Sequence, residues 1–482
     1  MHSISLLSRA HRLAIALALV TASLVTLRAA APTWDGTPVV EPILPADVQL
    51  PVSQANFNNL AWQQFIALNW TADPHHPGQP NLAVPPSKFG AQGDTSPTVW
   101  ESFKESSEVF RPDGRAPAPW DAKRMLPAKF PATAHALSAT SPLGVKGLFA
   151  LSKFDGAHVQ RIVGLDGIHQ ADGHWLVSQS GYLALYEKRL NEDEFNYIVQ
   201  NKLYDATIQE TFAQTTGINL PDGTSAFATC GTIGAIEIKA AWIQLDDPKL
   251  WPLFKISKAW VSYPAGAKGS GSPKLVTVGL VGLHIIHKTA NAQQFVWTTF
   301  EHVNNAPSVA DIRQQTLKAW YTFYNPKVTT PPNVPPPSTP TPDYTTPVQV
   351  VRSIPISSST ANNIAALNQS VWSTIAAANP QSVFLNYELV NVLWPTNNSP
   401  TGGPGAQVPL TAGNPNPPIT QQPVANTTLE TYKQQLTCLT CHVGATTALP
   451  DNSSLASDYS FLFDDAGSPA GRNPSPAPAP KH

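Results

Sequence analysis

The chain has 482 residues, of which 30 are Lys or Arg and 32 are Asp or Glu, so its formal net charge is −2. A near-neutral chain lacks the basic surface with which proteins bind nucleic acids, and we expect no nucleic-acid partner. Only 13% of the residues are charged, about half the usual share, and the 48 prolines are about twice the usual frequency. The length is sufficient for one large core or for two domains.

Residues 1–31 have the pattern of an export signal. Arg9 and Arg12 form a basic start, residues 13–27 are apolar, and three alanines at 29–31 resemble a cleavage site. This pattern predicts a signal peptide and a periplasmic protein. Pro32 disfavours cleavage after Ala31, so an uncleaved membrane anchor is the second interpretation. The apolar stretch is shorter than the roughly 20 residues that span a bilayer.

The sequence after the signal predicts helices first. Residues 53–69 carry apolar side chains at helical spacing and predict an amphipathic helix. Ser96 followed by Pro97 predicts the start of a second helix, because serine caps helices and proline fits the first turn. This second helix is expected to carry Trp100, Phe103 and Phe110.

From about residue 145 the sequence becomes typical of β-strands. Strands are predicted within residues 181–190, 235–245, 254–263, 275–288 and 295–303, which are rich in β-branched and aromatic residues. A helix is expected directly after Asn191, and another at 308–324. Many strands with few helices between them predict an α+β fold with a largely antiparallel β core and flanking helices.

A proline-rich connector divides the chain. Residues 326–347 are expected to form an extended linker between an α+β domain at 32–325 and a C-terminal helical region at 348–467. An amphipathic helix is predicted from Ile364, and residues 386–394 form a short apolar segment. The tail at 468–482 is expected to be disordered.

The C-terminal region contains the sequence Cys438-Leu439-Thr440-Cys441-His442. This spacing is the one through which c-type haem is attached to proteins. On a helix, positions i, i+3 and i+4 share one face, so both cysteines and the histidine can meet the same edge of a porphyrin. Two of the three cysteines in the chain are used here.

On these five residues and the export signal, the chain resembles a large exported bacterial c-type cytochrome without an assigned activity. The resemblance implies one covalent haem c, with Cys438 and Cys441 as attachment points and His442 as the proximal iron ligand. Only 40 residues follow His442, and they contain no Met. The region upstream must therefore cover much of the haem.

Within the last 40 residues, four side chains are candidates for the local wall of a haem pocket, and a role as ordinary core residues is equally open. They are Tyr459, Phe461, Leu462 and Phe463.

Two other interpretations of the paired cysteines are open. A structural zinc site needs four ligands, and the sequence offers no second Cys/His cluster to complete one. A redox dithiol needs a cysteine at a helix N-terminus, where the dipole lowers the thiol pKa. The capping signal at residues 427–430 instead predicts a helix in which the cysteines come about ten residues later. Cys230 is expected to be a small buried residue.

The sequence does not decide the sixth iron ligand. Three residues are candidates, and the alternative is that the protein supplies no sixth ligand. His284 and His302 lie on two strands that are predicted to form one hairpin and to present both rings on one side of the sheet. Met125 is the only methionine after the signal. Two strong ligands would suit electron transfer, whereas an open position would let a small molecule bind the iron.

Three functions are consistent with these features. The first is an electron-transfer cytochrome that exchanges electrons with a redox partner protein or a small-molecule donor or acceptor. The second is a haem oxidoreductase or peroxidase with an open iron face and Glu301 and His302 as a distal pair. The third is a β-rich ligand-binding protein in which the haem acts as a relay.

Overall fold

A computed structural model describes residues 34–124, 126, 128–149, 174–337, 341–395, 402–412, 415–416, 425–449 and 453–468. The predicted signal peptide, Met125 and nearly all of the predicted disordered tail lie outside these residues. Within the described ranges, no helix is both long and apolar enough to cross a bilayer.

The described residues form an α+β fold, as the sequence predicted. The helices are α1 (Gln54–Leu68), α2 (Ser106–Val109), α3 (Ala132–Thr140), α5 (Glu192–Gln200), α6 (Ala206–Thr215), α7 (Val309–Gln314), α8 (Ile364–Ala378) and α9 (Cys438–His442). Short 3-10 helices are η1 (Pro86–Lys88), η2 (Trp100–Ser102), η4 (Ser225–Phe227), η5 (Pro248–Leu253), η6 (Val383–Asn386) and η7 (Phe461–Asp465).

The strands are β1 (Lys104–Glu105), β2 (Lys146–Leu148), β3 (Leu185–Leu190), β4 (Ile236–Gln244), β5 (Ile256–Val261), β6 (Lys274–Thr289), β7 (Ala292–His302), β8 (Ser358–Ser359), β9 (Asn362–Asn363), β10 (Tyr387–Pro395) and β11 (Pro415–Asn416). Nine of them form one sheet in the order β1-β3-β4-β6-β7-β10-β11, in which β5 also pairs with β6, and β2 pairs with β5. All pairs in this sheet are antiparallel except β2 with β5.

Strand β10 lies beyond the proline-rich segment and yet pairs with β7, from Tyr387 opposite His302 to Leu393 opposite Trp297. Residues 32–325 and 348–467, which were predicted to lie on either side of a linker, therefore both contribute strands to one sheet. The segment is also held at Asn333, whose backbone N–H donates to Gln349 and whose side chain donates to the Val351 carbonyl.

Helices α1 and α8 cover one face of the sheet, which we call the helix face. Its side chains include Leu283, Ile285, Phe300 and Leu389, as the strand registers require. Phe300 packs against Phe65 of α1 with ring centroids 4.3 Å apart. Ser53 caps α1 by accepting a hydrogen bond from the Asn56 backbone, which fixes where this helix begins.

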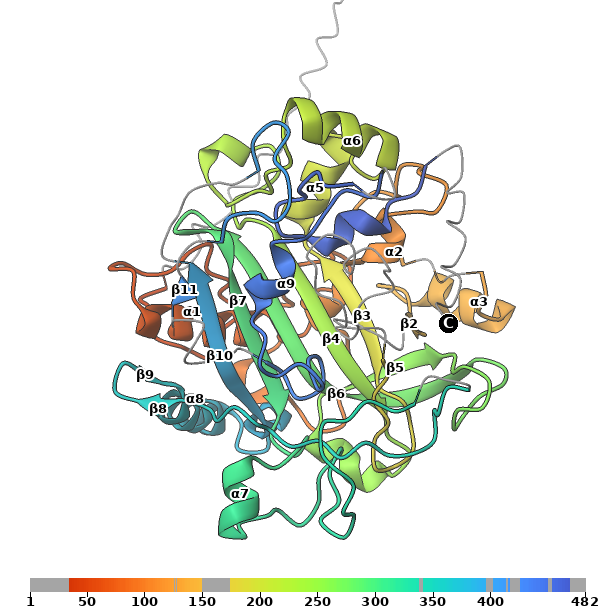
Figure 1. Cartoon of the computed structure of the whole chain (residues 1–482), viewed down its shortest axis with the longest axis vertical. Coiled ribbons are helices and arrows are strands. Elements are labelled where there is room, and N and C mark those ends of the chain that lie inside the picture. The colour runs from red at the N-terminus through yellow and green to blue at the C-terminus, as the bar shows by residue number, and fades with distance from the viewer. Residues whose placement is uncertain are drawn as a thin grey trace, which may run out of the picture. The chain divides into compact units, whose positions relative to one another are not determined.

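Residues 425–449 and 453–468 cover the opposite face, which we call the C-terminal face. Figure 1 shows α9 and the blue C-terminal segment crossing in front of the sheet, with α1 behind it. This face is rich in polar side chains, although most of it is buried. Its strand residues include the apolar Ile286 and Leu393 and also Lys188, Glu237, Lys239, His284, Trp297, Thr299, Glu301 and Glu388.

Three predicted helices differ from the structure. The helix expected at 308–324 ends at Gln314, because Gln315 adopts the left-handed conformation with φ 58°. In place of the helix expected from Ser96, the chain forms three short elements, η2, β1 and α2. In this segment the Glu101 carboxylate accepts from the Thr98 backbone and hydroxyl at 3.1 Å each, which favours a tight turn.

The third difference concerns the segment that leads to the cysteines. Residues 427–437 form turns, and the helix begins only at Cys438. The Thr427 backbone and hydroxyl both donate to Glu301 of β7, at 2.9 and 2.8 Å. Because this partner on the sheet takes the groups that would otherwise start a helix, tertiary contacts override the local capping signal.

Candidate haem-attachment site

Helix α9 carries the attachment motif and begins with it. Thr437 is its N-cap, and the threonine hydroxyl accepts a hydrogen bond from the Thr440 backbone. Cys438, Cys441 and His442 share one side of this single helical stretch, as haem attachment requires. Both cysteines are half-buried, and His442 is only 4% exposed.

The new start of the helix changes one argument about the cysteines. Their expected position late in a helix disfavoured a redox dithiol, but Cys438 is the first residue of α9. Position in the helix therefore no longer separates the dithiol from the haem interpretation. The surroundings of His442 are then the structural feature that bears on the choice between a dithiol and a haem site.

His442 is fixed by a backbone carbonyl. Its Nδ1 lies 2.6 Å from the Tyr459 carbonyl oxygen. A carbonyl can only accept, so Nδ1 carries the proton and the ring lone pair is on Nε2. Histidines that bind metals commonly donate their other ring N–H to a carbonyl in this way, because the bond sets both tautomer and orientation. His442 thus has the state expected of an axial ligand.

Aromatic side chains enclose the His442 ring. The Trp297 ring lies 4.4 Å from it between centroids, and the Phe461 ring lies 4.9 Å from it. Phe461 also packs with Cys441 and Ala445 in a small apolar cluster. Trp297 comes from β7, so the sheet supplies one wall and the C-terminal segment supplies the other.

The four wall candidates from the sequence are all buried, but they have different roles. Phe461 contacts His442, while Tyr459 supplies the carbonyl. Leu462 and Phe463 belong to the larger core cluster, in which Phe463 packs against Phe110.

The turn that presents the Tyr459 carbonyl has an uncommon backbone. Asp458 and Tyr459 have φ of 54° and 66°, both in the left-handed region. Two consecutive non-glycine residues there, one of them bulky, cost free energy that other contacts must offset. The Asp458 carboxylate accepts from the Lys288 ammonium and from the Leu220 backbone at 2.7 Å. A buried ion pair therefore holds the turn that orients His442.

His284 lies on the C-terminal face, where hydrogen bonds engage both of its ring nitrogens. Its Nε2 is 3.0 Å from Glu430, and its Nδ1 is 2.8 Å from the Thr299 hydroxyl. These bonds hold the ring between the sheet and residues 426–434. The structure therefore gives His284 the role of a packing residue that joins the two.

His302 lies on the other face of the sheet, so the expected pairing of His284 and His302 on one side is wrong. Its Nε2 is 2.9 Å from the Leu253 carbonyl, and Nδ1 accepts from the Asn304 backbone at 3.1 Å. The ring stacks on Phe254 at 4.1 Å. Burial lowers the pKa of His302 to about 3. The prediction is wrong because His284 lies opposite Thr299, and His302 follows Thr299 by three residues along β7. Side chains alternate between the two faces of a strand, so an offset of three residues places His302 on the opposite face.

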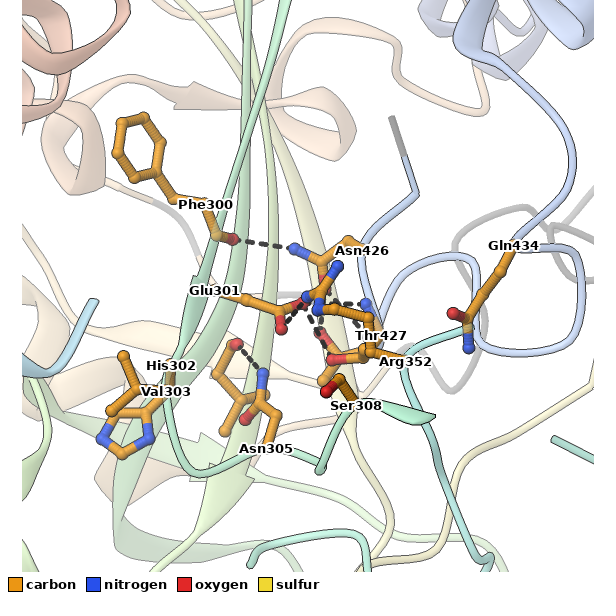
Figure 2. A network of polar contacts seen from close by, with 12 residues as sticks. Phe300, Glu301, His302, Val303, Asn305, Ser308, Arg352, Asn426, Thr427 and Gln434 are labelled. Carbon is orange, nitrogen blue, oxygen red and sulfur yellow. Dashed lines mark hydrogen bonds and ion pairs between the residues drawn. The ribbon is translucent and has the colours of Figure 1, made fainter. Parts of the chain in front are cut away.

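The expected distal pair of Glu301 and His302 does not converge either, because neighbouring residues in a strand point to opposite faces. Figure 2 shows His302 directed away from the carboxylate. Glu301 forms an ion pair with Arg352 and accepts both hydrogen bonds from Thr427. This network attaches the C-terminal segment to β7. In the sequence, the only sign of it is a carboxylate, Glu301, within a predicted strand.

Ligand requirements distinguish a haem from a bare metal ion. Within the described ranges, no three His, Cys, Asp or Glu side chains converge as ligands for a metal ion. A porphyrin supplies four iron ligands itself and requires from the protein only axial ligands and thioether attachment. The residues present, with a buried and oriented histidine next to two half-buried cysteines, fit that lower requirement.

No known protein family matches the sequence, no curated protein is significantly similar to it, and no solved structure significantly resembles its fold.

Proposed function

We propose that the protein is an exported c-type cytochrome that binds one covalent haem c and transfers electrons. The observation that carries the proposal is the haem-attachment spacing combined with His442, which is buried, oriented by the Tyr459 carbonyl and enclosed by Trp297 and Phe461. Residues 1–31 support a periplasmic location. The proposed partner is a redox protein or a small-molecule electron donor or acceptor.

Each residue of the site has a defined task in this proposal. Cys438 and Cys441 form the two thioethers, and His442 binds the iron through Nε2. The haem, when bound, supplies a one-electron redox centre. Trp297 and Phe461 keep water from the histidine, and the Tyr459 carbonyl raises the basicity of its ring by accepting a hydrogen bond from Nδ1–H.

The first experiment tests attachment. The full chain is produced in a host with c-type haem-maturation machinery and compared with the variants Cys438→Ser, Cys441→Ser, the double variant and the control Cys230→Ser. We expect the haem absorbance to remain with the denatured wild-type and Cys230→Ser chains, and to be lost from the double variant. Colourless wild-type protein with a Cys438–Cys441 disulfide would instead establish the dithiol interpretation.

A haem oxidoreductase with an open iron position is the second candidate function. It is favoured by the hydrogen bonds that engage both ring nitrogens of His284 and of His302, because neither histidine can then serve as sixth ligand in this conformation. Carbon monoxide separates the two candidates. A low-spin reduced spectrum that carbon monoxide does not change would support the carrier, whereas rapid formation of an adduct would support the oxidoreductase.

The turn at Asp458 offers a test of how His442 is held. In Asp458→Asn the ion pair with Lys288 is lost, so the Tyr459 carbonyl is held less firmly. We expect haem to stay covalently attached while the redox midpoint and the ligand-sensitive absorption bands shift. Asp465→Asn is the matched control, because Asp465 pairs with Lys188 in the same segment. Equal shifts in both variants would show that Asp458 has no special positioning role.

A further inference from the structure

A second potential ligand site lies at the far end of the sheet. A cleft of about 510 Å³ opens between the loop at 141–146, the start of β6 and the segment at 95–97. Its volume falls within the range of about 300–1,000 Å³ that is typical of small-molecule sites. Neither α9 nor any residue found around His442 contributes to its lining.

The distance along β6 separates this cleft from the haem-attachment site. Leu275 lines the cleft, whereas Ile286 pairs with Trp297, the residue that packs on His442. These two positions of β6 are 11 residues apart. At about 3.3 Å per residue this corresponds to roughly 35 Å. A molecule in the cleft therefore does not touch an iron held by His442.

Part of the cleft wall is apolar, between polar residues such as Thr95, Ser96 and Ser141. Leu137, Leu143, Val145 and Leu275 line it together with several prolines. Leu275 is 43% exposed, which is unusual for a large aliphatic side chain in a strand. Covering such surface removes apolar area from water and stabilises a bound molecule by about 25 cal/mol per Å². The walls thus favour a ligand with an apolar body.

The charged residues of the lining are mainly basic. Arg124, Lys146 and Lys258 contribute three positive charges, and Glu101 contributes one negative charge. The Lys258 ammonium donates to the Thr277 hydroxyl at 2.7 Å, which holds it at the edge. Lys146 is paired with Glu101 and with Glu187 behind it, so Arg124 and Lys258 are the cations that favour an anionic group on the ligand.

Arg124 has unused donor capacity at this position. Within the described part of the chain, its guanidinium donates a single hydrogen bond, to the Glu101 carbonyl, and its Nε has no acceptor. The nearest carboxylate oxygen, on Glu108, is 3.8 Å away. The side chain is only 8% exposed, so water cannot easily supply the missing acceptors. A guanidinium has five N–H donors, and such a group is well suited to bind a carboxylate.

Buried ion pairs hold the floor of the cleft rigid. The Lys146 ammonium lies 3.0 Å from Glu101 and 2.6 Å from Glu187, and 3.7 Å above the centre of the Trp242 ring. Burial by itself would raise the pKa of Glu101, but Lys146 and Lys255 lower it well below its usual value. The floor is therefore charged and ordered before any ligand binds, which lowers the cost of binding.

We propose that this cleft binds a small monocarboxylate with an apolar body, with the carboxylate on Arg124 and the body against Leu137, Leu143, Val145 and Leu275. The assignment is independent of haem attachment. It adds a ligand site whose lining shares no residue with the surroundings of the proposed iron ligand.

Calorimetric titration of the full chain with benzoate, benzamide and inorganic phosphate tests the chemistry. Benzoate has both the charge and the apolar body, benzamide lacks the charge, and phosphate lacks the body. We expect benzoate to bind at least tenfold more tightly than either of the others. Equal affinity for benzamide would overturn the role of the charge, and tighter binding of phosphate would overturn the role of the walls.

Two variants test the residues. Arg124→Gln is expected to weaken benzoate binding at least tenfold, whereas Lys123→Gln, at the neighbouring and exposed position outside the cleft, is expected to leave it unchanged. Leu275→Asp, at an exposed position that folding tolerates, is expected to abolish binding. Unchanged binding in both Arg124→Gln and Leu275→Asp would exclude the cleft as the site.

The double variant Cys438→Ser/Cys441→Ser separates this proposal from the haem proposal. We expect it to bind benzoate as tightly as the wild type does, with or without haem. Loss of benzoate binding in this variant alone would place the ligand at the haem-attachment site and overturn the cleft assignment.

Discussion

The two faces of the central sheet are both buried, but different interactions hold their coverings. The helix face packs aromatic rings, with Trp62 and Phe65 of α1 in contact with Phe300. The C-terminal face is covered through polar contacts, such as those of Glu301 with Arg352 and Thr427. Apolar packing is non-directional, whereas buried ion pairs and hydrogen bonds require one geometry.

Under the proposed function, this difference explains why the haem-attachment motif lies on the C-terminal face. A histidine that binds iron must keep one orientation, and directional contacts provide that. His442 is oriented by a carbonyl in a turn that the Lys288–Asp458 pair holds. Substitutions on each face, each with a matched control, test the roles of these two kinds of contact.

Phe300→Ala removes the ring at the centre of the helix face. Phe300 is fully buried, and truncation of such a ring leaves a cavity between Trp62 and Phe65. We expect the free energy of unfolding to fall by about 4 kcal/mol, measured by chemical denaturation. Leu82→Ala is the control, because Leu82 is 79% exposed and should change stability by less than about 0.5 kcal/mol. Similar values for both variants would refute the packing role of this face.

Arg352→Met breaks the buried ion pair of the C-terminal face. It leaves the Glu301 carboxylate without its cation, and we expect a loss of about 3 kcal/mol. The double variant Arg352→Met/Glu301→Gln should recover part of that loss, because it removes the uncompensated charge. Arg115→Met, at an arginine with a 78% exposed side chain, should have little effect. A double variant that is less stable than Arg352→Met would contradict this account.

Glu194→Gln tests a buried carboxyl group beside the same face. Both carboxyl oxygens of Glu194 are buried without a hydrogen-bond partner among the described residues. Burial and the nearby Glu237 and Asp458 carboxylates raise its pKa well above the usual value. The folded state therefore holds a proton that the unfolded state releases, and stability falls as pH rises from about 4.5 towards the raised pKa.

The expected slope from one such group is about 1.4 kcal/mol per pH unit within that window. Glu194→Gln should have a flatter stability profile, measured by thermal or chemical denaturation from pH 4 to 8, and become relatively more stable at the high end. Burial also raises the pKa of Glu237. The Glu194→Gln variant should therefore keep some loss of stability with rising pH, over a shorter pH range than the wild type. Glu210→Gln on α6 serves as the control. A profile for Glu194→Gln parallel to that of the wild type would exclude this carboxyl as the cause.

Ser53→Ala removes the N-cap of α1, the main helix on the helix face. The lost hydrogen bond to the Asn56 backbone should reduce the free energy of unfolding by about 1 kcal/mol. Ser373→Ala, on the exposed side of α8, should change it by less than half as much. Denaturation curves of the two variants measured side by side would test this, and a larger effect at Ser373 would contradict the capping role.

The sequence by itself determined the α+β class, the five central strands and the helices at 54–68, 192–200 and 364–378. These elements have strong periodic patterns or clear caps, such as Ser53 and Asn191, and such local signals act within a few residues. The haem-attachment role of residues 438–442 rests on residue type and spacing alone, and it stays a prediction.

Only the tertiary structure decided how these parts meet. It placed β10 beside β7 across the proline-rich segment, directed His302 away from His284, and began the motif helix at Cys438. Each outcome depends on partners that are distant in sequence, such as Glu301 for Thr427 and Tyr459 for His442. No local pattern encodes them, because strand register and the pairing of buried charges are set by the packing of the whole sheet.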